Sequence, residues 1–273
     1  MESHLNPINK PLKTLGILGC GWLGISAAEL FIKNGWSVKG SVRDPLNIKK
    51  LKSKGIIPFV YNLGDKGTLI SSFSIGLDLL IISIPPAIRN DPATNYLNTL
   101  LILSEQLNQY LPLNCRILFV STSGVYPAKG GPFSEKSEWN PDTEKSLALL
   151  SAERIIKKLP QETSVIRFAG LIGPDRHPVR SLSGKSEING GNLAANLIEK
   201  QDAVRLLWHL KTAVKLPEII NGVYPQKIKK ATYYYQKAKA LGIPAPLFLD
   251  SELPIDRLIT SEVSIGFSYE LTV

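Results

Sequence analysis

Short apolar runs alternate with amphipathic stretches along the first 170 residues of the chain. Residues 15–18 and 79–84 are largely apolar runs of the length typical of buried strands. Across residues 23–34 the apolar side chains recur at helical spacing, and Gly35 follows where a helix-ending glycine is expected. The same pattern predicts further strands at 36–42, 57–61, 116–121 and 164–168, and helices at 46–54, 94–110 and 144–158.

Strands and helices that alternate in this way are typical of the α/β class, with a Rossmann-type doubly wound parallel sheet. Such sheets bind ligands at the carboxyl ends of their strands, near the switch in strand order. We therefore expect a nucleotide-binding domain over residues 14–170, after a polar N-terminal tail at 1–13. Beyond residue 170 prolines and glycines interrupt the pattern, which indicates a smaller substrate lobe over 171–273 with helices at 202–211 and 231–241.

The composition is ordinary for a soluble protein, with 44% hydrophobic and 20% charged residues. No apolar run approaches the ~18 residues that a membrane span needs, and the N-terminus lacks the apolar core of a signal peptide. The two cysteines, Cys20 and Cys115, stand too far apart in sequence to suggest a disulfide framework or a metal site. We expect a cytoplasmic protein with two reduced thiols and no bound metal.

The formal net charge of +9 favours anionic partners. The densest basic stretch, residues 227–239, interleaves lysines with three consecutive tyrosines. A nucleic-acid surface with stacking aromatics is one interpretation, and it would require an affinity that falls steeply with salt. The more common structure for such a stretch is a solvated helix with its aromatic side chains turned inward, so we expect a small anionic ligand instead of nucleic acid.

A glycine loop carries the clearest chemical signal in the chain. Residues 15–24 read LGILGCGWLG, in which a strand runs into G-x-G-x-x-G and then into a helix. Gly19 permits the tight turn, Gly21 lets a pyrophosphate approach the backbone, and Gly24 lets the helix pack closely on the sheet. Trp22 and Leu23 open the helix, whose free N–H groups would face the phosphates. This pattern predicts a dinucleotide cofactor.

The second predicted strand bears on the choice between NAD and NADP. In NAD-binding proteins an acidic residue at its end binds the ribose 2′-hydroxyl, but Gly40 and Ser41 stand there. Arg43 follows within reach, and its planar guanidinium suits a 2′-phosphate. We therefore predict NADP, while Asp44 keeps NAD possible.

Residues 121–127, STSGVYP, end the predicted fifth strand. Together with the glycine loop they resemble the extended short-chain dehydrogenase/reductase superfamily of epimerases and dehydratases. RFAGLIGP at 167–174, RHP at 176–178 and SGK at 183–185 are most similar to its YeeZ-like branch. Asn196 to Ile198 with Asp202 match a segment of that branch, so we expect a segment around 196–222 to return from the smaller lobe to the Rossmann sheet. The resemblance covers residues 14–273 and implies an NAD(P)-dependent oxidoreductase or epimerase. At the strand ends it implies four further cofactor contacts, namely Asp65, Ser83, Pro85 and Gly170.

The chain departs from this superfamily at its catalytic residues. The resemblance places Thr122 at the catalytic Ser/Thr hydroxyl and implies a Y-x-x-x-K pair some 25 to 30 residues later. Alignment on Glu153 puts Lys145 at the tyrosine position and Leu149 at the lysine position, so the pair is missing. The literal Y-x-x-x-K at Tyr233 lies more than a hundred residues after Thr122, and we interpret it as coincidence.

Three side chains are candidates to replace the missing pair. Tyr126 follows Thr122 closely, Lys145 could assist it or act alone as the acid, and His177 titrates near working pH. Tyr126, Arg176, His177 and Lys185 are also the candidate contacts of an anionic substrate. Tyr126 could instead be a buried ring that closes the pocket, and His177 a loop-anchoring residue.

Two functions remain open on the sequence. The chain is an oxidoreductase or epimerase on a small polar, anionic or sugar-derived substrate, or it is a catalytically silent NAD(P) sensor or scaffold. The predicted helices at 94–110 and 144–158 are amphipathic, and the resemblance implies that they pair across a two-fold axis into a homodimer.

Overall fold

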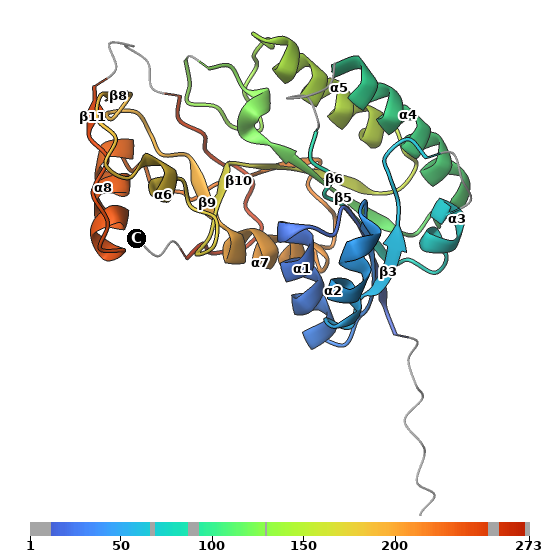
Figure 1. The fold of residues 1–273 in the computed structure, drawn as a ribbon. Coiled ribbons are helices and arrows are strands. Elements are labelled where there is room, and N and C mark those ends of the chain that lie inside the picture. The colour runs from blue at the N-terminus through green and yellow to red at the C-terminus, as the bar shows by residue number, and fades with distance from the viewer. Residues whose placement is uncertain (1–11, 66–68, 87–92, 129, 251–256, 271–273) are drawn as a thin grey trace, which may run out of the picture.

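The computed structural model describes residues 12–65, 69–86, 93–128, 130–250 and 257–270. A single parallel sheet of seven strands runs through the molecule in the order β10-β6-β5-β4-β1-β2-β3 (Figure 1). Its strands are β1 (Thr14–Leu18), β2 (Ser37–Val42), β3 (Ile57–Val60), β4 (Leu79–Ile82), β5 (Arg116–Thr122), β6 (Thr163–Phe168) and β10 (Ile219–Gly222). The order 3-2-1-4-5-6 is that of a Rossmann sheet, and the switch between β1 and β4 lies beside the glycine loop.

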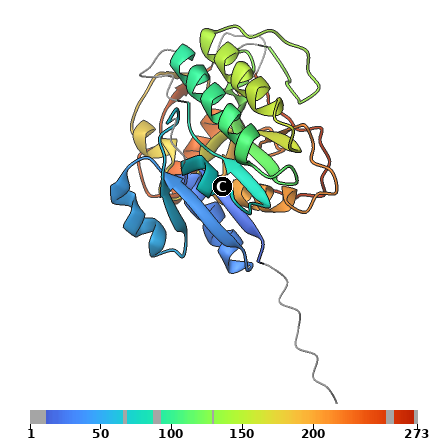
Figure 2. The ribbon, with the colours of Figure 1, turned by 90° about the vertical axis from the view of Figure 1, so that its right-hand side faces the viewer.

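Helices cover both faces of the sheet, as Figures 1 and 2 show. On one face lie α1 (Trp22–Lys33), α2 (Ile48–Lys52) and α7 (Lys200–Leu210), and on the other α3 (Leu69–Ser74), α4 (Ala93–Tyr110) and α5 (Glu144–Lys157). The alternation of β1 divides the core between them, because Ile17 packs with the first layer and Leu18 with the second. The α/β doubly wound fold is confirmed.

The second half of the chain contributes to both parts of the molecule. Strand β10 pairs with β6, and α7 packs on α1, so this stretch extends the main sheet and its helical layer. The remaining elements form a smaller lobe with two short parallel pairs, β7–β9 and β8–β11. That lobe consists of β7 (Gly170–Ile172), α6 (Pro178–Leu182), β8 (Ile188–Asn189), β9 (Leu197–Glu199), α8 (Lys230–Ala240) and β11 (Phe248–Leu249).

The predicted helices and strands agree with the structure to within a few residues, except for the helix at 46–54. Gly35 has φ +78° and ends α1 as predicted. The predicted helix at 46–54 is a 3₁₀ turn, Pro45–Asn47, followed by the shorter α2. No element was predicted at α3, at α6 or at the short strands β7, β8, β9 and β11. Strand β10 was not predicted as a strand, but it lies within the segment around 196–222 that was expected to return to the sheet. No helix among the described residues is both long and apolar enough to cross a membrane, and the compartment stays a prediction.

Candidate functional site

The glycine loop joins β1 to α1 in the geometry that the sequence predicts. Gly19 has φ +85°, and a Cβ there would lie 2.7 Å from the Ser83 carbonyl oxygen, so no other residue fits this turn. A Cβ on Gly24 would lie 2.9 Å from the Gly19 carbonyl oxygen, which keeps α1 close to the strand. A Cβ on Gly21 would meet no atom within 4 Å. The space above Gly21 is thus open, while the two other glycines fix the backbone around it.

The end of β2 supports this loop with a hydroxyl in place of a carboxylate. Ser41 is buried, its Oγ accepts a hydrogen bond from the Gly19 N–H at 2.9 Å, and its carbonyl accepts from the Cys20 N–H at 2.7 Å. Asp44 caps the next turn, since its carboxylate accepts from the Leu46 N–H at 2.9 Å. Arg43 is exposed beside them, and no carboxylate of the described chain lies within ion-pair distance of it.

The other predicted cofactor contacts lie at the carboxyl ends of neighbouring strands. Ser83 and Pro85 follow β4, and the Ser83 N–H donates to the Leu18 carbonyl, which ties this end to the glycine loop. Gly170 opens β7, where a Cβ would lie 2.9 Å from a Leu197 methyl. Asp65 lies farther off along the chain after β3, and its carboxylate accepts a hydrogen bond from the Asn62 N–H. Whether these residues touch a cofactor stays a prediction.

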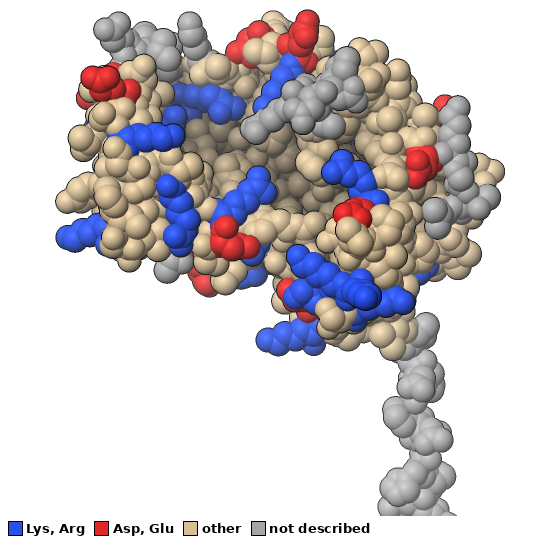
Figure 3. All heavy atoms as spheres, viewed as in Figure 1, with Lys and Arg blue, Asp and Glu red and all other residues tan. Residues whose placement is uncertain are grey.

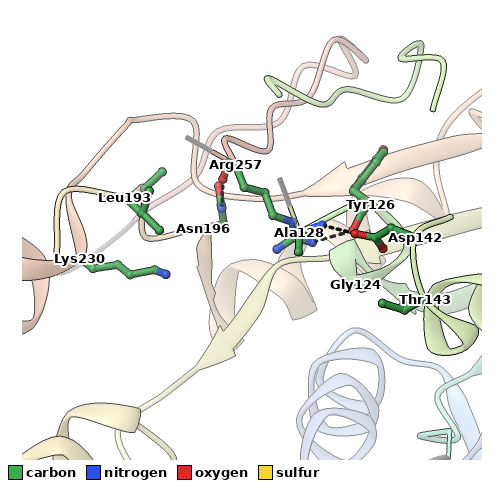
Figure 4. Close-up of a pocket in the computed structure, with 10 residues that line it drawn as sticks. Gly124, Tyr126, Ala128, Asp142, Thr143, Leu193, Asn196, Lys230 and Arg257 are labelled. Carbon is green, nitrogen blue, oxygen red and sulfur yellow. Dashed lines mark hydrogen bonds between the residues drawn. The ribbon is translucent and has the colours of Figure 1, made fainter. Parts of the chain in front are cut away.

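A cavity of about 450 Å³ opens between the loop after β5 and the smaller lobe, in the hollowed face of the molecule in Figure 3. Figure 3 also shows Lys and Arg side chains around this hollow. Figure 4 shows the residues that line it. From the sheet side these are Gly124, Tyr126, Ala128, Asp142 and Thr143, and from the lobe side Leu193, Ala194, Asn196, Lys230 and Arg257.

Arg257 contributes a cation to this cavity, and sequence reasoning missed it. Its guanidinium donates to the carbonyls of Ser123 at 2.5 Å and of Pro127 at 2.8 Å, within the loop that follows β5. Burial lowers the pKa of Arg257, and Asp142 opposes this effect from the same wall. Asn196 fixes the segment, because its side chain bonds the Arg257 carbonyl at 2.7 Å and the Ile259 N–H at 2.9 Å. No local motif marks Arg257, since only the chain fold brings it to β5.

Thr122 and Tyr126 lie on this loop but differ in their surroundings. The Thr122 hydroxyl oxygen accepts from the Gly124 N–H at 3.1 Å, and the side chain is half-buried. Tyr126 is only 2% exposed, and its hydroxyl lies 3.0 Å from Asn221 Oδ1 and 3.1 Å from the Ser134 carbonyl. Its phenol points away from Arg257 and into the protein (Figure 4).

A buried ion pair holds the Tyr126 hydroxyl in place. Arg167 on β6 donates from Nη2 to Glu153 of α5 at 2.7 Å and from Nη1 to the Tyr126 hydroxyl at 3.0 Å. Ser121 donates to the same carboxylate at 2.6 Å. Burial raises the pKa of Tyr126, although Arg167 and Asn221 act in the opposite direction. The phenol therefore stays protonated at neutral pH within a satisfied buried network.

The two positions of the missing catalytic pair lie on α5. Lys145 is exposed in the first turn of the helix. Leu149 is buried in a cluster with Tyr126 and Phe133, and its methyl would lie 3.6 Å from a Cβ on Gly124. An apolar side chain thus occupies the place of the superfamily's lysine.

Three predicted substrate contacts, Arg176, His177 and Lys185, do not line the cavity. His177 is buried, with Nε2 2.9 Å from the Tyr233 hydroxyl, while Nδ1 accepts from the Val179 N–H and caps α6. Burial lowers the pKa of His177 to about 4, with smaller contributions from Lys237 and Arg180. Lys185 is exposed. Arg176 lies over the ring of Trp22, with Cζ 5.2 Å from the ring centroid.

The described residues hold no group of three His, Cys, Asp or Glu side chains that could bind a metal ion. Both cysteines are buried free thiols, and burial raises the pKa of each to about 12. Cys20 lies inside the glycine loop, where its Sγ would be 2.9 Å from a Cβ on Gly40. Its role there is to fill space.

No family model matches the chain. Among solved structures it resembles UDP-glucuronic acid 4-epimerase from Bacillus cereus in complex with UDP-glucuronic acid and NAD, with TM-score 0.76 and 18% identity over 95% of each chain. It also resembles UDP-glucose 4-epimerase from Thermotoga maritima, with TM-score 0.75 and 16% identity over 96% of this chain and 94% of the other. Both likenesses show the fold of the extended short-chain dehydrogenase/reductases.

A sequence relative gives a closer relationship. Protein YeeZ of Escherichia coli strain K12 is 30% identical over 246 residues, which cover 88% of each chain. This match covers more than two thirds of both chains at 30% identity. The chain therefore belongs to the YeeZ family, and it has the fold of the two epimerases named above.

Proposed function

We propose that the protein binds NAD or NADP across its glycine loop and acts as an oxidoreductase or epimerase. The observation that carries this proposal is the open space above Gly21, flanked by two glycines that no other residue could replace. No side chain caps the N-terminus of α1, so its first N–H groups face this space. The solved structures with this fold include UDP-glucuronic acid 4-epimerase of Bacillus cereus and the enzyme WbmH of Bordetella bronchiseptica, each in complex with NAD. When bound, the dinucleotide supplies hydride exchange.

The surroundings of the adenosine end favour NADP over NAD. At the end of β2 the Ser41 hydroxyl, which accepts from the Gly19 N–H, stands where NAD-binding proteins carry a carboxylate. The Asp44 carboxylate caps the following turn through Oδ1, which accepts from the Leu46 N–H. Exposed Arg43 is the charged group left for a 2′-phosphate.

Arg43→Gln tests this preference. The variant should bind NADP about 10- to 100-fold more weakly, the worth of one charge-assisted hydrogen bond, and should bind NAD within about twofold of the wild type. Calorimetric titration with both dinucleotides measures the four affinities. Equal affinities of the wild-type protein for the two cofactors would overturn the choice of NADP.

The cavity is the proposed substrate site. Its volume of about 450 Å³ suits a small molecule. The Arg257 guanidinium bonds backbone carbonyls and no carboxylate of the described chain, so its positive charge remains available to an anionic group. A small polar substrate with a carboxylate or phosphate, of the sugar-derived kind that the structural neighbours bind, fits these features.

For proton transfer we propose Thr122, assisted by Lys145. The Thr122 oxygen accepts from the backbone, which leaves its O–H free to donate toward the substrate. Neither residue itself lines the cavity, but Thr122 stands two residues before the cavity-lining Gly124, and exposed Lys145 stands two residues beyond the cavity-lining Thr143. Tyr126 and His177 already have buried partners, and for both we now favour a structural role.

A catalytically silent NAD(P) sensor is the second candidate. It is favoured by Leu149, whose apolar side chain fills the place of the superfamily's catalytic lysine. A screen of anionic sugars, sugar nucleotides and keto acids with NADP and NADPH distinguishes the two. Turnover that falls at least tenfold in Thr122→Val supports the enzyme, whereas cofactor binding with no turnover supports the sensor.

We also propose a homodimer formed by α4 and α5. Leu101 and Leu147 are 46% and 50% exposed, and Leu97, Leu150 and Ile155 are half-buried beside the helices' core contacts. Sedimentation of a species of twice 30.0 kDa that reverts to monomer in Leu101→Glu would support this interface.

A further inference from the structure

Trp22, the first residue of α1, links the glycine loop to the smaller lobe. Its indole Nε1 donates to Asp175 Oδ2 at 2.8 Å, in the loop that follows β7. Gly173 makes room for the ring, because a Cβ there would lie 3.0 Å from the Trp22 Cζ2. The hydrogen bond joins two residues that are 153 positions apart in sequence.

Two cations flank the same ring. Arg176 Cζ lies 5.2 Å and Lys200 Nζ 4.6 Å from the ring centroid, both at cation–π distance. Lys200 also pairs with Asp175 Oδ1 at 3.3 Å, and its side chain is only 17% exposed. No carboxylate of the described chain pairs with Arg176. The cluster therefore carries two positive charges against one negative charge.

This excess charge lies over the side chain of Trp22, the first residue of α1. The backbone of Trp22 begins the helix, and its neighbour Gly21 borders the open space of the proposed cofactor site. A pyrophosphate bears two negative charges, and one of the two cations is already balanced by Asp175. Arg176 is the cation without a partner.

We propose that Arg176 completes the pyrophosphate-binding part of the cofactor site, and that Trp22, Asp175 and Lys200 hold the smaller lobe against the glycine loop. The inference rests on the proposed cofactor function. It moves Arg176 from the substrate contacts to the cofactor contacts, in agreement with its absence from the cavity lining. It also separates two arginines by role, because Arg43 would serve only a 2′-phosphate whereas Arg176 would serve every dinucleotide.

Calorimetric titration of NAD and NADP into Arg176→Gln tests the inference. Both affinities should fall by the same factor, about 10- to 100-fold, since both cofactors share the pyrophosphate. Arg176→Lys should recover part of the loss because it retains the charge. Arg180→Gln is the matched control, an exposed arginine one turn away on α6, and it should leave both affinities unchanged.

Trp22→Phe tests the link itself, because it keeps an aromatic ring for the cations but removes the N–H that bonds Asp175. Both affinities should fall, by about three- to tenfold for one neutral-donor hydrogen bond to a carboxylate. In the wild-type protein, addition of NADPH should change the tryptophan emission, and the part of this change that comes from Trp22 should disappear in the variant.

Three outcomes overturn the proposal. Arg176→Gln could bind both cofactors as the wild type does, or it could lose NADP alone, which would make Arg176 a 2′-phosphate contact. It could also keep cofactor affinity while raising KM for a substrate, which would return it to the substrate site. A wild-type protein that binds neither cofactor would instead refute the proposed function.

Discussion

The backbone shapes one end of the candidate site, whereas side chains shape the other end. At the cofactor end the backbone of Gly19, Gly21 and Gly24 shapes an open space beside the N–H groups of α1. At the substrate end the side chains of Tyr126, Arg167 and Glu153 form a buried network beneath the cavity. The first end matches the G-x-G-x-x-G pattern, and the second lacks the Y-x-x-x-K pair that the resemblance implies.

This difference explains why the sequence predicts the cofactor end but not the substrate end. A backbone that must adopt positive φ or approach a ligand closely requires glycine, so its geometry leaves a local pattern. A buried polar network requires only that each group finds a partner, and those partners come from β5, β6, α5 and β10, which are far apart in sequence.

The largest expected effect concerns the substrate end. Glu153→Gln should lower the free energy of unfolding by about 3–5 kcal/mol, because it leaves the buried Arg167 charge without its carboxylate. Urea denaturation measures this loss. As a control, Glu105→Gln, at an exposed position on α4, should change the free energy of unfolding by less than about 0.5 kcal/mol. A loss below about 1 kcal/mol in Glu153→Gln would show that this end does not depend on the ion pair.

The next effect depends on pH. The folded pKa of His177 is lowered to about 4, below the unfolded value of about 6.5, so the neutral ring stabilises the fold above pH 6.5 and this contribution is lost as the pH falls toward 4. Between pH 7 and pH 4.5 the wild-type protein should lose about 2 kcal/mol more than His177→Gln. Parallel urea curves at the two pH values test this. An equal loss in both proteins would mean that the pKa of His177 in the folded protein is close to its unfolded value of about 6.5.

The smallest effect sharpens the role of Tyr126. Tyr126→Phe removes the hydroxyl from Arg167 and Asn221 and should cost about 1–2 kcal/mol of stability. Cofactor affinity should not change, because the hydroxyl is bonded to Arg167 and Asn221 within the buried network. If stability is unchanged while turnover of an identified substrate falls about 100-fold or more, Tyr126 is the proton donor after all.

The sequence predicted the sheet, its first six strands and the glycine loop, because hydrophobic periodicity and glycine spacing are local signals. It did not predict β10 as a strand, because the short IING segment has no strand pattern of its own, and only the resemblance indicated that a segment around 196–222 returns to the sheet. Arg257 was missed for the same reason, since the chain must fold before it reaches the loop after β5. Arg176 and His177 are the opposite case, because the sequence predicted that they contact the substrate and they do not line the cavity. The short strand β7 separates both from β6, so that Arg176 lies over the Trp22 ring and His177 caps α6 beside Tyr233.

The central claim is that the backbone around Gly21 holds a dinucleotide. Calorimetric titration of NADP into the wild-type protein and into Gly21→Ala tests it directly, because the added Cβ meets no protein atom within 4 Å and should leave the fold intact. We predict one site per chain in the wild type, a loss of affinity on the order of 100-fold in the variant, and thermal midpoints within about 2 °C of each other. A variant that binds NADP as tightly as the wild type, or a wild-type protein that binds no dinucleotide, would contradict the account.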